Sequence, residues 1–127
     1  MLDINTAKTK ARPSVLIVED DPFIAIDLED AFLDAGYRVL GPCATVEDAL
    51  CAARSERPDI ATLDFDLMDS TSRRVAELLS ELDVPFLLVT SMRREALEAP
   101  CFKNRECFAK PFDADKLVSR TGELVAA

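Results

Sequence analysis

The sequence predicts an α/β domain built as a doubly wound parallel sheet. Short apolar runs alternate along the chain with longer segments in which apolar residues recur at helical spacing. The length of 127 residues and the apolar content of 49% fit a single domain. Acidic, hydroxyl and lysine side chains follow several of the apolar runs directly, as expected where parallel strands end.

Five apolar runs are the strand candidates. We expect them in a domain spanning residues 14–127, preceded by a flexible leader over residues 1–13. Each run is short and is bounded by polar or turn-forming residues, which is typical of strands buried on both faces. The candidates are Val15–Glu19, Arg38–Leu40, Ile60–Asp64, Phe86–Thr90 and Cys107–Ala109.

The first predicted helix lies between the first two strands. Asp21 is a favoured N-cap residue, Pro22 fits the first helical position, and Gly36 ends the segment. One apolar stripe along this helix can pack on the sheet, since its members recur at helical spacing. They are Ile24, Leu28, Ala31, Phe32 and Ala35.

Three further segments have helical spacing. The second helix opens with Thr45 three residues before Asp48, which resembles a capping box, and Pro58 closes the segment. Met92–Pro100 has room only for a short helix. The apolar stripes are Val46, Ala49, Leu50 and Ala53 in the second helix, Val75, Leu78, Leu79 and Leu82 in the third, and Leu117, Thr121 and Leu124 in the last.

The composition excludes several classes of function. The chain has no histidine, which excludes zinc sites that need imidazole, Ser-His-Asp and Cys-His nucleophile pairs, and phosphorylation on its own histidine. The net charge of −9 disfavours binding to nucleic acid or to anionic membranes. No apolar run approaches the roughly 20 residues of a membrane span, and the polar start is unlike a signal peptide. We expect a cytoplasmic protein whose cysteines, Cys43, Cys51, Cys101 and Cys107, are mostly structural thiols.

The candidate functional residues lie where the predicted strands end. Because the carboxyl ends of parallel strands meet at one edge of a sheet, side chains that follow different strands should converge there. The residues concerned are Glu19, Asp20, Asp64, Thr90, Ser91 and Lys110.

Four stretches of the sequence resemble the receiver domain of bacterial two-component response regulators. They are VLIVEDDP, the run from Pro58 to Asp64, PFLLVTS and AKPF, and the resemblance extends over about Ser14 to Val125. It implies a flavodoxin-like (βα)5 fold with a five-stranded parallel sheet of order 2-1-3-4-5. The ending of the chain after one such domain resembles the stand-alone type of receiver.

The resemblance implies a role for each residue at the predicted edge. Asp64 would be the phosphoacceptor, and Mg²⁺ would be held by Glu19, Asp20, Asp64 and the backbone carbonyl of Asp66. Oxygen ligands of this kind suit Mg²⁺. The phosphoryl group would contact Thr90, Ser91 and Lys110, and Pro111 is a candidate cis-proline.

The implied function is signal transduction in a phosphorelay. Asp64 would receive a phosphoryl group from a sensor histidine kinase or a histidine phosphotransfer protein, since this chain has no histidine of its own. The phosphorylated protein, a monomer or weak dimer, would then bind a downstream protein through the helix expected in Met92–Pro100, the strand Cys107–Ala109 and the last helix. Such a domain is a phosphoacceptor rather than an enzyme, although it can catalyse its own phosphorylation and dephosphorylation.

The sequence departs from the family pattern at two places. Cys107 stands where the family often has an aromatic switch residue, with Phe108 beside it, so we place the conformational change around Ser91–Pro100 instead. The loop after Asp64 lacks the usual Gly or Pro, and Asp66 adds a carboxylate close to the phosphoacceptor. That carboxylate could either slow hydrolysis of the acyl phosphate or position a water for it.

Two other functions are compatible with parts of the sequence. The acidic site and Lys110 could persist as a stabilising network in a pseudo-receiver, a binding module that works without phosphorylation. The Asp64-Phe65-Asp66 spacing also matches the D-x-D motif of haloacid-dehalogenase-type phosphatases, but Met68 does not fit that motif and the chain is short for that family.

Overall fold

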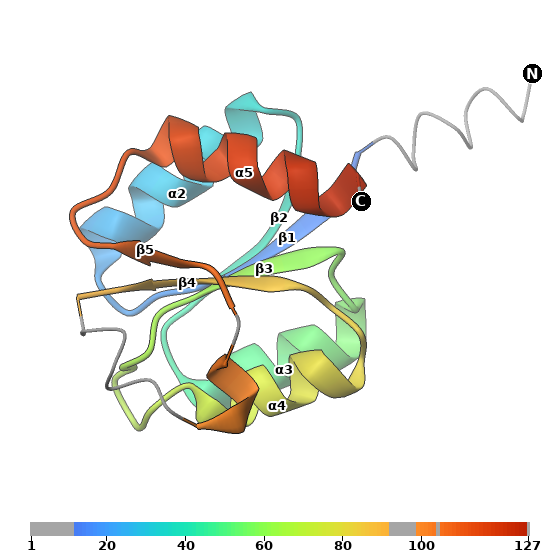
Figure 1. The fold of residues 1–127 in the computed structure, drawn as a ribbon, viewed down its shortest axis with the longest axis vertical. Helices are drawn as coiled ribbons and strands as arrows, with labels where there is room; N and C mark the ends of the chain where they lie inside the picture. Colours follow the sequence, from blue (N-terminus) through green and yellow to red (C-terminus); the bar gives the residue numbers. More distant parts are fainter. Residues whose placement is uncertain (1–11, 92–98, 104, 127) are drawn as a thin grey trace, which may run out of the picture.

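A computed structural model describes residues 12–91, 99–103 and 105–126 of the chain. It contains a five-stranded parallel sheet of order β2-β1-β3-β4-β5 (Figure 1), which confirms the predicted fold class and strand order. Most of the expected leader and of the helix expected in Met92–Pro100 lie outside the described residues. The strands are β1 (Ser14–Val18), β2 (Arg38–Cys43), β3 (Ile60–Leu63), β4 (Phe86–Thr90) and β5 (Cys107–Ala109).

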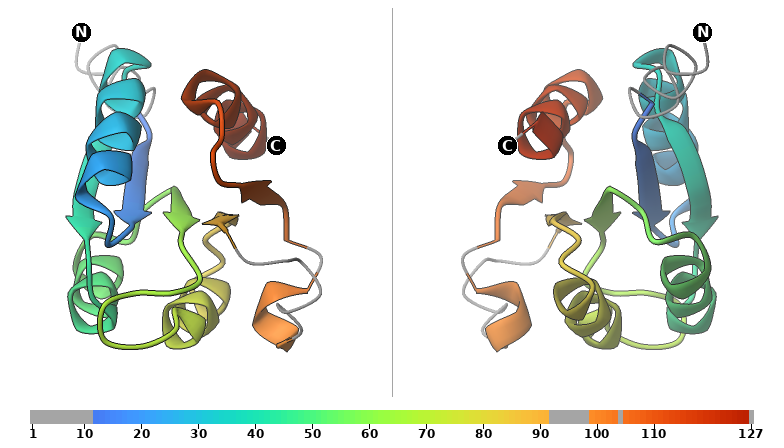
Figure 2. Two further views of the ribbon diagram at one scale, coloured as in Figure 1. Left: turned by 90° about the vertical axis from the view of Figure 1, so that its left-hand side faces the viewer. Right: turned by 90° about the vertical axis from the view of Figure 1, so that its right-hand side faces the viewer.

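The helices cover both faces of the sheet. Helices α2 (Pro22–Asp34) and α5 (Ala114–Ala126) lie on one face, and α3 (Val46–Glu56) and α4 (Arg73–Glu81) lie on the other (Figures 1 and 2). The short 3₁₀ helix η2 (Pro100–Phe102) lies on the α3 and α4 face, where Phe102 is buried. Among the described helices, none is long and apolar enough to cross a membrane.

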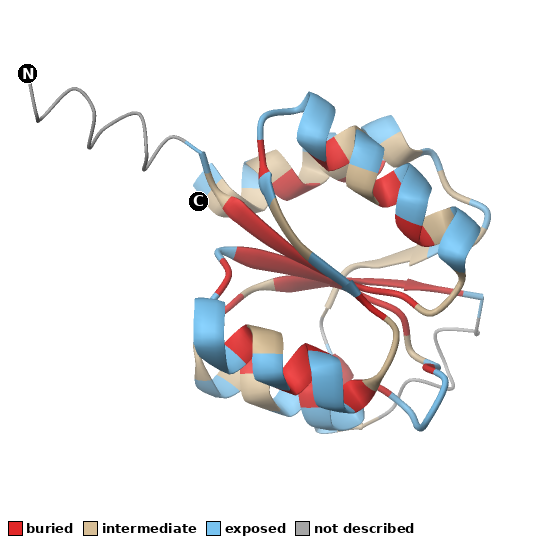
Figure 3. Ribbon diagram, turned by 180° about the vertical axis from the view of Figure 1, so that it is seen from behind, coloured by how far each residue is buried: buried red, intermediate tan, exposed pale blue. Residues whose placement is uncertain are grey.

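Two hydrophobic clusters, one on each face, hold the layers together. Side chains alternate along each central strand, so that Leu16 contributes to the cluster under α3 and α4 whereas Ile17 contributes to the cluster under α2 and α5. The three central strands are buried along their whole length (Figure 3). A sheet buried in this way leaves its strand ends, rather than its faces, as the place for polar chemistry.

The helix starts follow the predicted capping. The Asp21 carboxylate accepts hydrogen bonds from the backbone N–H groups of Phe23 and Ile24, and the Thr45 hydroxyl accepts one from Asp48. The predicted stripe of α2 is partly wrong, because the buried residues of that helix are Ala25, Leu28 and Phe32. Ala35 is the exposed C-cap residue, since the helix ends at Asp34.

Three predicted strand boundaries are corrected by the sheet register. β1 runs from Ser14 to Val18, and β3 ends at Leu63, so Glu19 and Asp64 stand just beyond their strands. β2 continues past Leu40 to Cys43 through a shift in its pairing with β1. The extension contains Pro42, which is tolerated there because β2 is an edge strand.

Candidate functional site

The carboxyl ends of β1, β3, β4 and β5 bring the predicted site residues together. Val18 pairs with Leu63, and Thr90 pairs with Ala109, so the residues that follow these strands lie at one edge. The Asp64 N–H donates to the Val18 carbonyl at 3.0 Å, and the Lys110 N–H donates to the Thr90 carbonyl at 3.1 Å. The backbone pairing of the sheet therefore fixes the positions from which the Asp64 and Lys110 side chains extend.

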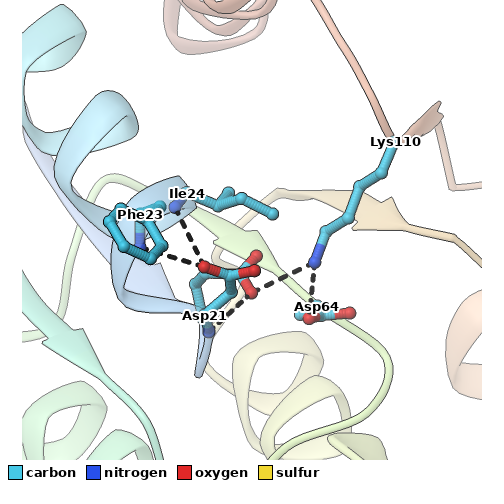
Figure 4. A network of polar contacts seen from close by, with 6 residues as sticks. Asp21, Phe23, Ile24, Asp64 and Lys110 are labelled. Atoms are coloured by element: carbon cyan, nitrogen blue, oxygen red, sulfur yellow. Dashed lines mark hydrogen bonds and ion pairs between the residues drawn. The ribbon is translucent and has the colours of Figure 1, made fainter.

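Lys110 connects two carboxylates that come from different strands. Its Nζ lies 2.9 Å from Asp64 Oδ2 and 3.1 Å from Glu19 Oε2. Figure 4 shows the lysine side chain extending toward Asp64 across the edge of the sheet. Burial alone would lower the pKa of Lys110, but the hydrogen bonds to Asp64 and Glu19 outweigh burial and raise it above its ordinary value. The lysine is therefore a permanent cation within the site.

Glu19 is the most deeply buried of these charged side chains, with only 1% of its surface exposed. Its Oε2 accepts hydrogen bonds from Lys110 and from the Asp21 N–H at 3.1 Å. Desolvation is the main cause that raises its pKa to about 7, and the nearby Asp64 charge adds to this effect. Glu19 Oε1 is buried and has no hydrogen-bond partner. A carboxylate oxygen in that condition is available to a cation.

The donor set fits a hard divalent cation. One carboxylate oxygen from each of Glu19, Asp20 and Asp64 lies within 4.8 Å of the other two, and the unpartnered Glu19 Oε1 belongs to the same carboxylate cluster. Oxygen ligands from carboxylates are what Mg²⁺ prefers, usually together with retained waters. The third acidic residue of the VLIVEDDP stretch, Asp21, is instead used as the N-cap of α2.

The remaining predicted site residues surround this cluster. Thr90 is buried at the end of β4 and Ser91 is exposed immediately after it. Asp66 is exposed two residues beyond Asp64. The Lys110–Pro111 peptide bond is cis, as is the bond between Gly41 and Pro42, which the sequence analysis did not single out.

Cys107 and Phe108 face opposite sides of the sheet. Cys107 packs against the cluster under α3 and α4, whereas Phe108 packs against the cluster under α2 and α5. By strand alternation Thr90 shares the side of Leu88, which pairs with Cys107 and belongs to the first of these clusters. Phe108 therefore does not stand in for an aromatic residue at position 107.

The loop after Asp64 has a defined shape although it lacks Gly and Pro. The Leu67 N–H donates to the Ser70 carbonyl at 2.9 Å, and the Ser72 N–H donates to the Phe65 carbonyl at 2.8 Å. Leu67 is buried in the hydrophobic cluster under α3 and α4. The Phe65 ring packs against Phe102 of η2 with a centroid distance of 5.4 Å. This segment, residues 65–72, is called the 65–72 loop below.

Two side-chain contacts near the site could not be predicted from the sequence. The Asp21 N–H reaches Glu19, and Asp69 in the 65–72 loop reaches the backbone of Val46 at the start of α3. The sequence near Asp69 gives one indication of such a contact, because aspartate is a residue type favoured at helix starts. Its partner lies 23 residues earlier in the chain. Such a contact depends on the packing of two loops rather than on local spacing.

The cysteines differ in environment. Cys43 is buried, Cys101 and Cys107 are half-buried, and Cys51 is exposed on α3. Cys43, Cys101 and Cys107 belong to or pack against the hydrophobic cluster under α3 and α4, which fits the expectation of mostly structural thiols, whereas Cys51 is exposed.

The sequence matches the model of the response regulator receiver domain over residues 15–121. The chain therefore belongs to the family of response regulator receiver domains, which act in two-component signalling. This membership favours the receiver interpretation over the phosphatase interpretation of Asp64-Phe65-Asp66.

Individual relatives share the fold and part of the sequence. Phyllosphere-induced regulator PhyR of Methylorubrum extorquens is 34% identical over 101 residues, which cover 77% of this chain and 38% of that protein. Chemotaxis protein CheY of Thermotoga maritima is 25% identical over 114 residues, which cover 87% of this chain and 95% of CheY. The solution structure of the PhyR receiver domain of Erythrobacter litoralis covers 91% of both chains at 27% identity, with a TM-score of 0.79. The chain thus spans less than half the length of PhyR and nearly all of CheY.

Proposed function

We propose that this chain is a phosphorylation-dependent signalling switch in which Asp64 accepts a phosphoryl group from a phosphohistidine of another protein. One observation carries the proposal: the Asp64 carboxylate lies in an acidic cluster with Glu19 and Asp20 and is also 2.9 Å from the Lys110 ammonium. A nucleophilic carboxylate repels an anionic phosphoryl group unless cations offset the two negative charges. The site offers one cation, the Lys110 ammonium, and a carboxylate cluster that could hold a second.

The transfer would replace one bond to phosphorus by another. An Asp64 carboxylate oxygen forms a bond to phosphorus while the bond from phosphorus to the donor's imidazole nitrogen breaks, and the bonding electron pair returns to that nitrogen. The product is an acyl phosphate on Asp64 and a free histidine on the donor. Mg²⁺, held by Glu19, Asp20, Asp64 and the Asp66 carbonyl, would supply positive charge to the phosphoryl oxygens.

The other residues of the site have roles that follow from their positions. Lys110, which contacts Asp64 and Glu19, would pair with a phosphoryl oxygen, since its raised pKa keeps it charged. Thr90, at the end of the neighbouring strand, would donate a hydrogen bond to an oxygen that exists only after transfer. Ser91 is small and exposed and leaves space beside that oxygen. A contact that exists only in the phosphorylated state would favour one conformation of the protein over the other.

The donor would be a sensor histidine kinase or a histidine phosphotransfer protein, and the output would be binding of a downstream protein. We also propose that the chain acts in the cytoplasm, where ATP could supply the phosphoryl group of such a donor. Because Phe108 faces away from the Thr90 side, we assign the conformational change to the backbone around Ser91–Pro100, within the longer segment Ser91–Phe108. Unchanged amide exchange in that segment after phosphorylation would contradict this assignment.

The test is chemical labelling followed by intact mass measurement. Wild-type protein, Asp64→Ala and the control Asp30→Asn, an exposed carboxylate of α2, are incubated with acetyl phosphate with and without Mg²⁺. We expect a single base-labile phosphoryl adduct in the wild type and in the control, dependent on Mg²⁺, and none in Asp64→Ala. An adduct that persists in Asp64→Ala, or no adduct in the wild type with either acetyl phosphate or a phosphohistidine protein, would refute the proposal. Full affinity of Asp64→Asn for a captured partner would support the pseudo-receiver alternative instead.

A further inference from the structure

The 65–72 loop is fastened to the loop that precedes α3. Asp69 Oδ1 accepts a hydrogen bond from the Val46 N–H at 3.0 Å. The neighbouring Met68 N–H donates to the Ala44 carbonyl at 3.4 Å. Two adjacent residues of one loop therefore contact two nearby residues of the other, at the same end of the sheet as the acidic site.

The hydrogen bond from Val46 fills a need of α3. The first N–H groups of a helix have no partner within the helix and require an acceptor from elsewhere. The Thr45 hydroxyl serves Asp48, and the Thr45 carbonyl accepts from Ala49, so neither bond involves the Val46 N–H. The Asp69 carboxylate supplies the acceptor for Val46 and places a negative charge at the positive end of the helix dipole.

The same contact restrains the residues that follow the phosphoacceptor. Leu67 is held in the hydrophobic cluster and Asp69 is held at α3, so the backbone of Asp66 lies between Asp64 and two anchored residues. Loops of this type usually depend on Gly or Pro for their shape, and this loop has neither. Backbone contacts already shape this loop, among them the bridge between Asp66 and Thr71 and the hydrogen bond from Met68 to Ala44. The side chain of Asp69 adds a further restraint at the start of α3.

We propose that Asp69 is a positioning residue for the metal and phosphoryl site. It holds the 65–72 loop against the start of α3 and so keeps the Asp66 carbonyl in place as a metal ligand; this role rests on the proposed function. Outer residues that orient ligands commonly change metal affinity about 10–100-fold when they are removed. A backbone carbonyl is one ligand among several, so we expect the lower part of that range or somewhat less.

Two conservative variants distinguish a role of the Asp69 hydrogen bond from a role of the Asp69 charge, because the two roles predict opposite results. Asp69→Asn retains a side-chain oxygen at the same distance along the chain but loses the charge, whereas Asp69→Glu retains the charge and displaces it by one methylene. If Asp69 acts by its hydrogen bond, Asn preserves the function and Glu impairs it. If Asp69 acts only by attracting cations, the order is reversed. Glu47→Gln is the matched control, because Glu47 is an exposed carboxylate in the first turn of the same helix.

The experiment measures Mg²⁺ binding to the full chain by calorimetry and exchange of the Val46 amide by NMR. We expect Asp69→Ala and Asp69→Glu to weaken Mg²⁺ binding by about 3–10-fold and to accelerate exchange at Val46. Asp69→Asn and Glu47→Gln should stay within about twofold of wild type. Thermal unfolding in EDTA detects a general loss of stability in a variant. The Mg²⁺ affinities of Asp69→Asn and Asp69→Glu are compared under conditions in which their unfolding midpoints match.

Wild-type affinity in Asp69→Glu, or equal weakening in Asp69→Asn and Asp69→Ala, would overturn the role of Asp69. Failure of this proposal can be told apart from failure of the proposed function, since Mg²⁺ binding and amide exchange need no phosphoryl group. Absence of an adduct on wild-type Asp64 would defeat the proposed function and leave these measurements to decide on Asp69.

Discussion

The Lys110 ammonium and the Asp64 carboxylate lie 2.9 Å apart although 46 residues separate them in the chain. The same ammonium also contacts Glu19, so one cation serves two carboxylates that are almost fully buried. Two anions at this depth repel each other and lose hydration, and both effects are offset by the lysine. The site is therefore held together before any divalent ion binds.

Removal of this lysine should destabilise the protein in the absence of Mg²⁺. Lys110→Ala leaves two buried carboxylates without a counter-charge, and we expect a loss of about 1–3 kcal/mol in the free energy of unfolding, less than for a fully buried pair because Lys110 is partly exposed. The measurement is urea unfolding at pH 7.5 in EDTA and in excess Mg²⁺. Mg²⁺ should recover part of the loss, since it binds only the folded state. Lys116→Ala, an exposed lysine of α5, should stay within about 0.5 kcal/mol of wild type, and equal stability of both variants would contradict this account.

Glu19 should make stability fall as pH rises toward neutrality. Its folded-state pKa of about 7 lies above the ordinary value of 4.5, so the folded state binds more protons than the unfolded state between these values. The stabilising contribution is fully present below about pH 4.5 and is lost as pH rises through 7. The size of this change is at most about 3 kcal/mol. We expect urea unfolding in EDTA to show wild type losing stability relative to Glu19→Gln between pH 5 and pH 8. A constant difference across that range would refute the assignment of the titration to Glu19.

Asp66 should influence how long the phosphoryl group remains on Asp64. It is exposed and follows Asp64 by two residues, and we expect its charge to affect the attack of water on the acyl phosphate. We expect Asp66→Asn to change the lifetime of the acyl phosphate by about threefold or more, measured by loss of the mass adduct over time. Asp30→Asn, which removes an exposed charge from α2, should leave the lifetime unchanged. Equal lifetimes in the two variants would remove this role from Asp66.

The cysteines should react with thiol reagents in the order of their exposure. Cys51 is exposed, whereas Cys43 is 7% exposed and burial raises its pKa, which reduces the fraction of reactive thiolate. Labelling of the native protein at pH 8 should modify Cys51 first and Cys43 only on unfolding. Cys51→Ser should abolish the fastest phase and Cys43→Ser should leave it intact. Rapid labelling of Cys43 in the native protein would show that the start of α3 opens readily.

Much of the architecture could be predicted because it depends on local periodicity. The alternation of short apolar runs with helical stripes identified all five strands, and parallel strands bring Glu19, Asp64 and Lys110 to one edge. The extension of β2 to Cys43 could not be foreseen in the same way. Whether a strand tolerates Pro42 depends on its position at the edge of the sheet, which is a property of the whole fold.

The finer contacts of the site also lay beyond local pattern. Glu19 shares one oxygen between Lys110 and the Asp21 N–H, and this arrangement results from the turn into α2. Asp69 contacts Val46 only because two loops pack at the same end of the sheet. Residue types and their order therefore indicate which groups meet, while the partners of each oxygen are set by tertiary packing.

The contact between the Phe65 and Phe102 rings connects Asp64, the proposed phosphoacceptor, with the segment that precedes β5. Phe65 is covalently next to Asp64, and Phe102 is buried in η2 shortly before β5. Because close-packed rings cannot separate without leaving a void, a displacement of Phe65 must be followed by Phe102 or must open a cavity. A chemical event at Asp64 would thus be transmitted through two tilted aromatic rings to η2, a few residues before the last strand of the sheet.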